Sequence, residues 1–227
     1  MTKSLLISIQ PQHLLNILNG DKTYEVRKVV PKWVLDKLDK DETVEAYLYC
    51  TKPKKRWSVG HMIFFNDELY RTPKGEIKYG SSVELMAYDN CDKNNYLSGK
   101  IPVKVVIDGY VKLEHQEFMD NGYEDPRTYA YFYEDDNPIL KEMCLTHDEL
   151  ENYANGKDLY ALHISKVEIL DEVMELDDFY RRIDGLDDNG GFKLDSLKDG
   201  EHVSIPQLKK KYLVSRPPQS FMTVWVK

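Results

Sequence analysis

Residues 10–28 read QPQHLLNILNGDKTYEVRK, and this stretch decides how we expect the chain to fold. Pro11 suits the first turn of a helix, where its missing N–H is not needed. Four apolar side chains follow at helical spacing and predict one buried stripe: Leu14, Leu15, Ile17 and Leu18. Gly20 ends this helix, because glycine tolerates the left-handed conformation of a helix C-terminus.

A strand with polar residues on one face is expected after the helix. Side chains alternate between the two faces of a strand, so three of them share one face: Thr23, Glu25 and Arg27. Lys22 stands at the entrance to this strand, and His13 is expected on the surface of the helix. The apolar run of residues 5–9 predicts a further strand ahead of the helix.

This unit resembles the signature of ASCH domains, a branch of the PUA-like superfamily. Residues 20–28 resemble the Gly-x-Lys-Thr pattern with its alternating Glu/Arg strand. Residues 159–164 (LYALHI) resemble a late core strand, and residues 216–221 (RPPQSF) resemble the closing motif of longer, often phage-borne members. The resemblance implies an α+β fold, a PUA-like β-barrel with helices packed at its mouth.

We expect a single domain over residues 1–227. The matched segments are separated by expected insertions at about 52–99, 115–157 and 184–215. Five segments have the pattern of strands, at residues 5–9, 43–50, 101–113, 159–170 and 221–226. A strand near each end of the chain fits a small closed barrel whose terminal strands lie together. Asp108-Gly109 predicts a bend or bulge, and Thr146 with Glu149 has the spacing of a capping box.

Composition limits the classes of function. The formal net charge is -8, which argues against sequence-independent binding of duplex nucleic acid, since that binding needs basic surfaces. Three separated cysteines without Cys-x-x-Cys spacing favour a reducing compartment and argue against structural zinc. No apolar run approaches the ~20 residues of a membrane span, and no secretory signal is recognisable. We therefore expect a cytoplasmic protein with no membrane partner and no tightly bound metal or cofactor.

The charged strand supplies the first candidate ligand-binding residues, which are Lys22, Thr23, Glu25 and Arg27. Arg27 offers a rigid fork of donors for a phosphate or a base edge, and Glu25 could accept from an exocyclic amine. From spacing alone, the alternative is a structural ion pair between Glu25 and Arg27. The family resemblance favours a pocket, and that hypothesis requires both side chains to face a solvent-filled recess.

Three further groups of candidates lie elsewhere in the chain. A basic loop ending on an aromatic could hold phosphate and stack a base, through Lys52, Lys54, Lys55 and Trp57. Its alternative is a solvated loop. His163 lies in the family-like strand, although a lone histidine there is usually a satisfied core residue. The segment before the closing strand could line the same barrel mouth through Arg216, Gln219 and Ser220, or it could be a stiff connector.

These observations leave three hypotheses of function. The first is a recognition domain for single-stranded RNA or a nucleotide-like small molecule, because exposed bases can be read without a strongly basic surface. The second is a hydrolase acting on a modified nucleoside or on RNA, with Lys22 and Glu25 as acid–base residues. Family members that resemble amidohydrolases carry threonine three positions after the lysine, and Glu25 replaces that nucleophile here. The third is a protein-interaction module that targets a host factor.

Overall fold

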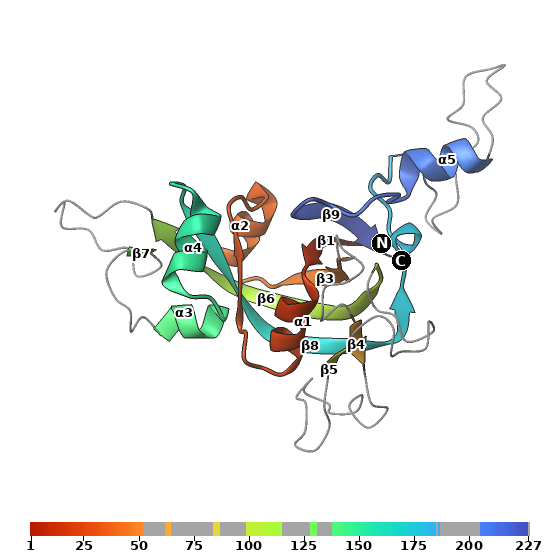
Figure 1. Ribbon diagram of the computed structural model, residues 1–227. Coiled ribbons are helices and arrows are strands. Elements are labelled where there is room, and N and C mark those ends of the chain that lie inside the picture. Colours follow the sequence, from red (N-terminus) through yellow and green to blue (C-terminus); the bar gives the residue numbers. More distant parts are fainter. Residues whose placement is uncertain are drawn as a thin grey trace.

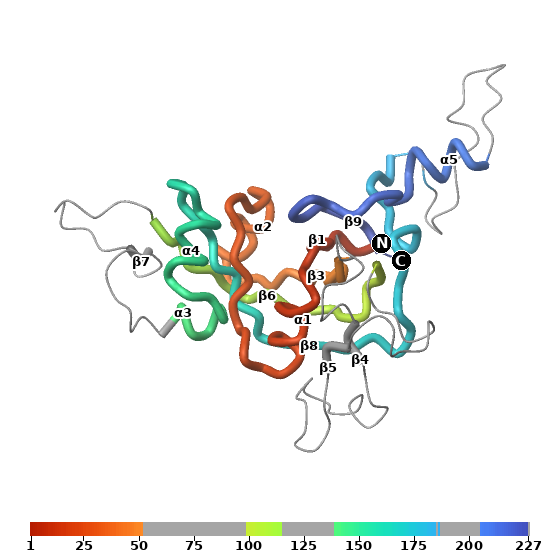
Figure 2. Tube along the Cα trace, in the orientation of Figure 1, coloured from red at the N-terminus to blue at the C-terminus, as the bar shows by residue number. Residues whose placement is uncertain are grey.

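The computed structural model describes residues 1–51, 62–64, 84–86, 99–114, 128–130, 138–184, 186 and 205–226. Figures 1 and 2 show the path of the chain. Its strands are β1 (Thr2–Ile9), β2 (Tyr24–Arg27), β3 (Val44–Cys50), β4 (Met62–Phe64), β5 (Glu84–Met86), β6 (Ile101–Glu114), β7 (Thr128–Ala130), β8 (Leu159–Met174) and β9 (Phe221–Val226). Its α-helices are α1 (Pro11–Leu18), α2 (Lys32–Leu38), α3 (Pro138–Met143), α4 (His147–Ala154) and α5 (Ile205–Tyr212). Within these ranges no helix has the length and apolar character needed to cross a membrane.

One mixed sheet organises the molecule, with the strand order β2-β8-β6-β3-β1-β9 and with β7 beside β6. The first and last strands pair in antiparallel fashion, from Thr2↔Val226 to Ile7↔Phe221, so the predicted adjacency of the terminal strands is confirmed. The mixed α+β class is also confirmed. The expected closed barrel is wrong, because β2 and β9 are the two outer strands and do not pair with each other.

The two longest strands bend where the sequence predicted a bend. The register between β6 and β8 shifts between Val106 and Ile107 and again between Ile107 and Gly109. A residue inserted on one strand bends that strand and increases its twist. Figure 1 shows β6 and β8 curving, which turns the sheet around the core.

The main core lies between the sheet and the first two helices. Leu14, Ile17 and Leu18 of α1 are buried against Leu5 and Ile7 of β1, as the stripe predicted, whereas Leu15 is only half-buried. Burying each large aliphatic side chain stabilises the fold by about 1.5–3 kcal/mol. Gly20 has φ +79, which explains why the helix ends with a glycine.

A second apolar cluster covers the other face of β2. Val26 packs there with Met143 of α3 and with Leu150 and Ala154 of α4. The capping box of α4 is present, since the Thr146 side chain accepts from Glu149 N–H and Glu149 accepts from Thr146 N–H. Helices α3 and α4 fall within one of the expected insertions, at about residues 115–157, and they pack against β2.

Candidate functional site

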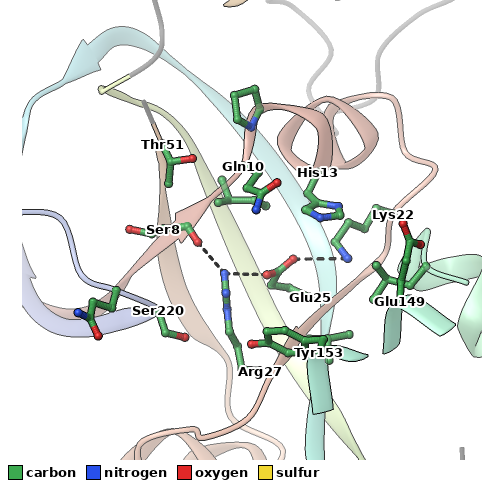
Figure 3. A pocket seen from close by; sticks show the side chains of 15 residues that line it. Ser8, Gln10, His13, Lys22, Glu25, Arg27, Thr51, Glu149, Tyr153 and Ser220 are labelled. Atoms are coloured by element: carbon green, nitrogen blue, oxygen red, sulfur yellow. Dashed lines mark hydrogen bonds and ion pairs between the residues drawn. The ribbon is translucent and has the colours of Figure 1, made fainter. Parts of the chain in front are cut away.

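A pocket of about 800 Å³ lies where the outer edge of β2 approaches the end of β1 (Figure 3). Its walls come from the end of β1, the start of α1, β2, α4 and the segment before β9. Ligand pockets for small molecules are typically this size. The space therefore lies beside the outer edge of β2, which pairs with no other strand among the described residues.

Three buried charges form one wall of this pocket. Arg27 Nη2 lies 2.7 Å from Glu25 Oε1, and Lys22 Nζ lies 3.5 Å from Glu25 Oε2. Arg27 is 9% exposed, Glu25 6% and Lys22 3%. The alternation of β2 brings Glu25 and Arg27 to one face, as predicted, and Lys22 reaches the carboxylate from the turn before the strand. Glu25 is therefore held between two cations.

Main-chain carbonyls fix both cations. Arg27 Nη2 donates to Ser8 O at 2.8 Å, which links β2 to β1 across the gap in the sheet. Lys22 Nζ donates to Met143 O at 2.7 Å, which links the same wall to the end of α3. Both cations are thus held in place before any ligand arrives.

Two buried nitrogens at the pocket have no hydrogen-bond partner. They are Nε of Arg27 and Nδ1 of His13. A buried polar group left unsatisfied costs about 1–3 kcal/mol, so native structures usually give it a partner.

His13 is a pocket residue and not a residue of the open helix surface, so that expectation is wrong. Burial of its ring lowers the pKa of His13, and the charges of Lys22 and Arg27 lower it further, while Glu25 and Glu149 oppose the shift. The imidazole is therefore neutral at neutral pH. A neutral ring can donate from one nitrogen and accept at the other.

Helix α4 supplies the rim of the pocket. Hydrogen bonds from the Thr146 backbone and side chain lower the pKa of Glu149, so its carboxylate is ionised. Tyr153 is 37% exposed, and Lys28 Nζ lies 5.1 Å from the centre of its ring. The rim thus offers one carboxylate and one aromatic side chain.

The structure brings together part of the predicted site. Five candidates line the pocket: Lys22, Glu25, Arg27, Gln219 and Ser220. Thr23 is not among the lining residues, and its hydroxyl donates to Glu142 Oε2 at 3.2 Å. Arg216 is exposed and lies outside the pocket lining. The candidates of the basic loop, Lys52, Lys54, Lys55 and Trp57, lie outside the described residues.

His163 lies away from the pocket. His163 belongs to β8 and pairs in register with Tyr24 of β2. Paired residues share a face, so His163 lies on the opposite face of the sheet from Glu25. Its Nδ1 is 2.6 Å from Asp108 Oδ1, and its side chain is 37% exposed, so the residue is not in the core.

Several residues that line the pocket were not among the candidates predicted from the sequence. Among them are Ser8, Gln10 and Thr51 near β1 and β3, and Leu145, Glu149 and Tyr153 near α4. Glu149 and Tyr153 are four residues apart, so the helix that the capping box at Thr146 indicates would place them on one face. Nothing local in the sequence indicates that this face meets β2, because that contact is long-range.

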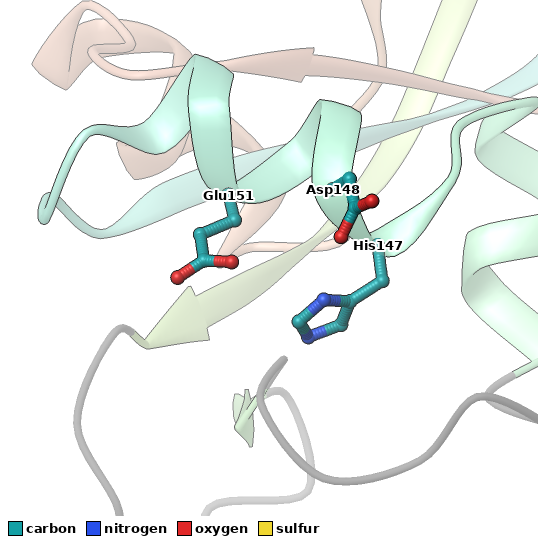
Figure 4. A group of neighbouring side chains, drawn as sticks. All are labelled: His147, Asp148 and Glu151. Atoms are coloured by element: carbon teal, nitrogen blue, oxygen red, sulfur yellow. The ribbon is translucent and has the colours of Figure 1, made fainter.

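A second group of polar side chains lies at the start of α4 (Figure 4). Ligand atoms of His147, Asp148 and Glu151 lie within 4.8 Å of one another. Asp148 and Glu151 are exposed, and the positive end of a helix dipole favours anions over cations. We assign no function to this group.

Comparison with known proteins gives remote similarity only. No protein-family model matches the chain, and no curated protein matches its sequence. The crystal structure of an ASCH protein from Zymomonas mobilis matches with a TM-score of 0.42 and 12% identity, covering 99% of this chain and 87% of that chain. A single-substitution variant of the same protein matches with a TM-score of 0.42 and 13% identity, covering 100% of this chain and 91% of that chain.

The first prediction concerns the buried charges. Arg27→Ala removes the main partner of the Glu25 carboxylate and the link to Ser8. Breaking a buried ion pair costs about 3–5 kcal/mol, and we expect this loss in the free energy of unfolding from urea titration. Arg216→Ala, at an exposed position, is the matched control and should change stability by less than about 0.5 kcal/mol. Equal losses in the two variants would contradict the prediction.

The second prediction concerns pH. Because the pKa of His13 is lowered from 6.5, the folded state binds this proton more weakly than the unfolded state. The contribution of His13 to stability is complete above pH 6.5 and is lost as pH falls from 6.5 through the lowered value. Urea midpoints measured across this range should fall more steeply for the wild type than for His13→Gln. Parallel curves would show that His13 does not titrate as its burial requires.

Proposed function

We propose that the pocket beside β2 binds single-stranded RNA or a nucleotide-like small molecule. The observation that carries the proposal is the buried Arg27 side chain, which lines the pocket and whose Nε has no acceptor. Buried donors in native structures usually have an acceptor, so an unsatisfied one calls for an explanation. Here Glu25 and Ser8 occupy Nη2 and hold the group in position, while Nε is buried and has no acceptor.

The remaining lining suits a planar polar ligand. Gln219 and Ser220 add polar side chains, and Tyr153 adds an aromatic face at the rim. Stacking of a base on an aromatic side chain does not require a basic surface, which agrees with a chain of net charge -8. The sequence resemblance of residues 20–28 to the ASCH signature supports the same class of ligand.

The third prediction tests the aromatic contact. Tyr153→Ala should weaken the binding of RNA oligomers and mononucleotides by about 5- to 150-fold, the equivalent of ~1–3 kcal/mol per stacked base. Tyr153→Phe keeps the ring and should bind as the wild type does. Asn152→Ala, which alters an exposed neighbour outside the pocket lining, is the control. The measurement is a fluorescence or calorimetric titration. Affinity unchanged by Tyr153→Ala would remove the stacking role, and no binding by the wild type would remove the proposed function.

A hydrolase is the second candidate, and His13 is the observation that favours it. A neutral imidazole that lines the pocket can act as a general base. Lys22 and Glu25, the acid–base candidates from the sequence, are engaged with each other and with neighbouring groups. The interaction module rests on the acidic composition and on the expected insertions, and it stays a prediction.

The fourth prediction tests catalysis. The full chain is incubated with acetylated cytidine and, separately, with an RNA oligomer, and the products are analysed by mass spectrometry. If His13 is the base, His13→Gln should lower turnover by about 10²- to 10⁴-fold, with binding retained. Turnover that survives His13→Gln would exclude His13 as the base, and binding without turnover by the wild type would leave recognition as the function.

A further inference from the structure

The pocket is lined from both faces of β2, and this is possible only across the outer edge of that strand. Glu25 and Arg27 line it from the face that meets Ser8. Leu145 and Tyr153 line it from the side of α4, where the Val26 side chain packs. Among the described strands β2 pairs only with β8, so its other edge is open to the pocket. Val26 is itself a lining residue.

The hydrogen-bond pattern of β2 fixes which backbone groups this edge presents. Ile164 N–H donates to Thr23 O at 2.7 Å, and Tyr24 lies opposite His163. In an antiparallel ladder, backbone groups of successive residues point to opposite sides. Glu25 and Arg27 therefore direct their N–H and C=O groups at β8, and Val26 directs both of its groups away from β8, toward the edge of β2 that borders the pocket. At this edge Val26 thus presents a hydrogen-bond donor, its N–H, beside an acceptor, its C=O.

The charges of the lining favour an uncharged partner for this edge. Two cations, Lys22 and Arg27, are balanced by two carboxylates, Glu25 and Glu149. A phosphate in a formally neutral, partly buried site would carry uncompensated charge, which is costly. A nucleobase is uncharged, and its Watson–Crick edge carries an adjacent donor and acceptor.

We infer that Val26 reads a nucleobase: its N–H donates to a ring acceptor of the base, and its C=O accepts from the neighbouring N–H group. This rests on the proposed function and names the part of the ligand that the pocket holds. The Tyr153 ring is then available to stack on the base. An extended peptide could also add to a strand edge, but peptide addition uses several alternate residues, and β2 has four residues in all.

The test follows individual amides of the ¹⁵N-labelled full chain by NMR hydrogen exchange. Addition of a ribonucleoside that binds should slow exchange of the Val26 amide by about 10-fold or more at saturation. The amides of Glu25 and Arg27, which point at β8, are internal controls and should be unchanged. Slowed exchange at all three amides, or at none, would overturn the inference.

Ligand analogues give a second readout that needs no protein variant. A nucleoside methylated on its Watson–Crick ring nitrogen should bind about 5- to 150-fold more weakly, and a 2′-O-methyl nucleoside should bind normally. Equal affinity for the base-methylated and unmodified nucleosides would overturn the inference while leaving the proposed function intact. Failure of the wild type to bind any nucleoside or RNA oligomer would overturn both, and protection of Val26 by an extended peptide alone would overturn the nucleobase assignment.

A proline substitution at Val26 tests the proposed backbone donor directly. Proline is tolerated on edge strands when its nitrogen faces away from the ladder, so Val26→Pro removes the proposed donor without breaking a β2–β8 bond. It should lose nucleoside affinity by a similar factor, whereas Asn152→Ala, at an exposed position outside the pocket lining, should keep it. Because Val26 is also buried against α3 and α4, circular dichroism must first show that the variant folds. A folded Val26→Pro variant that binds the nucleoside as tightly as the wild type would overturn the inference.

Discussion

Arg27 joins two strands that do not pair with each other. Its guanidinium contacts the Glu25 carboxylate on its own strand and the Ser8 carbonyl of β1. A backbone ladder between the outer strands β2 and β9 would have closed the sheet. Arg27 instead links β2 to the end of β1 by a side chain, which leaves room for the pocket beside it.

The same arrangement explains why a structural role and a binding role do not exclude each other. Burying three charges is costly, and their mutual attraction offsets that cost only when the geometry is good. Lys22 and Arg27 each reach a carbonyl as well as Glu25, so the wall is rigid without a ligand. Rigid donors lose little freedom when they bind, which is how preorganised sites gain affinity.

Local patterns in the sequence predicted the elements well, and they predicted the site in part. The stripe of α1, the face shared by Glu25 and Arg27, and the capping box of α4 all depend on residues within one or two turns of each other. Closure of the sheet depends on whether the outer strands β2 and β9 pair, and residues that are close in the sequence do not determine that long-range contact. His13 was placed on the surface for the same reason, since its burial comes from β2 and α4.

Ser8 and Pro218, whose hydrogen bond holds the segment before β9 against β1, are 210 residues apart in the chain. During synthesis β1 leaves the ribosome long before β9 exists to pair with it. Its unpaired edge is a place where nascent chains can associate wrongly, and contacts of this range form slowly. The wall of the pocket that contains Gln219 and Ser220 is therefore among the last parts of the molecule to form. A chain still under synthesis has an incomplete pocket and cannot yet bind a ligand there.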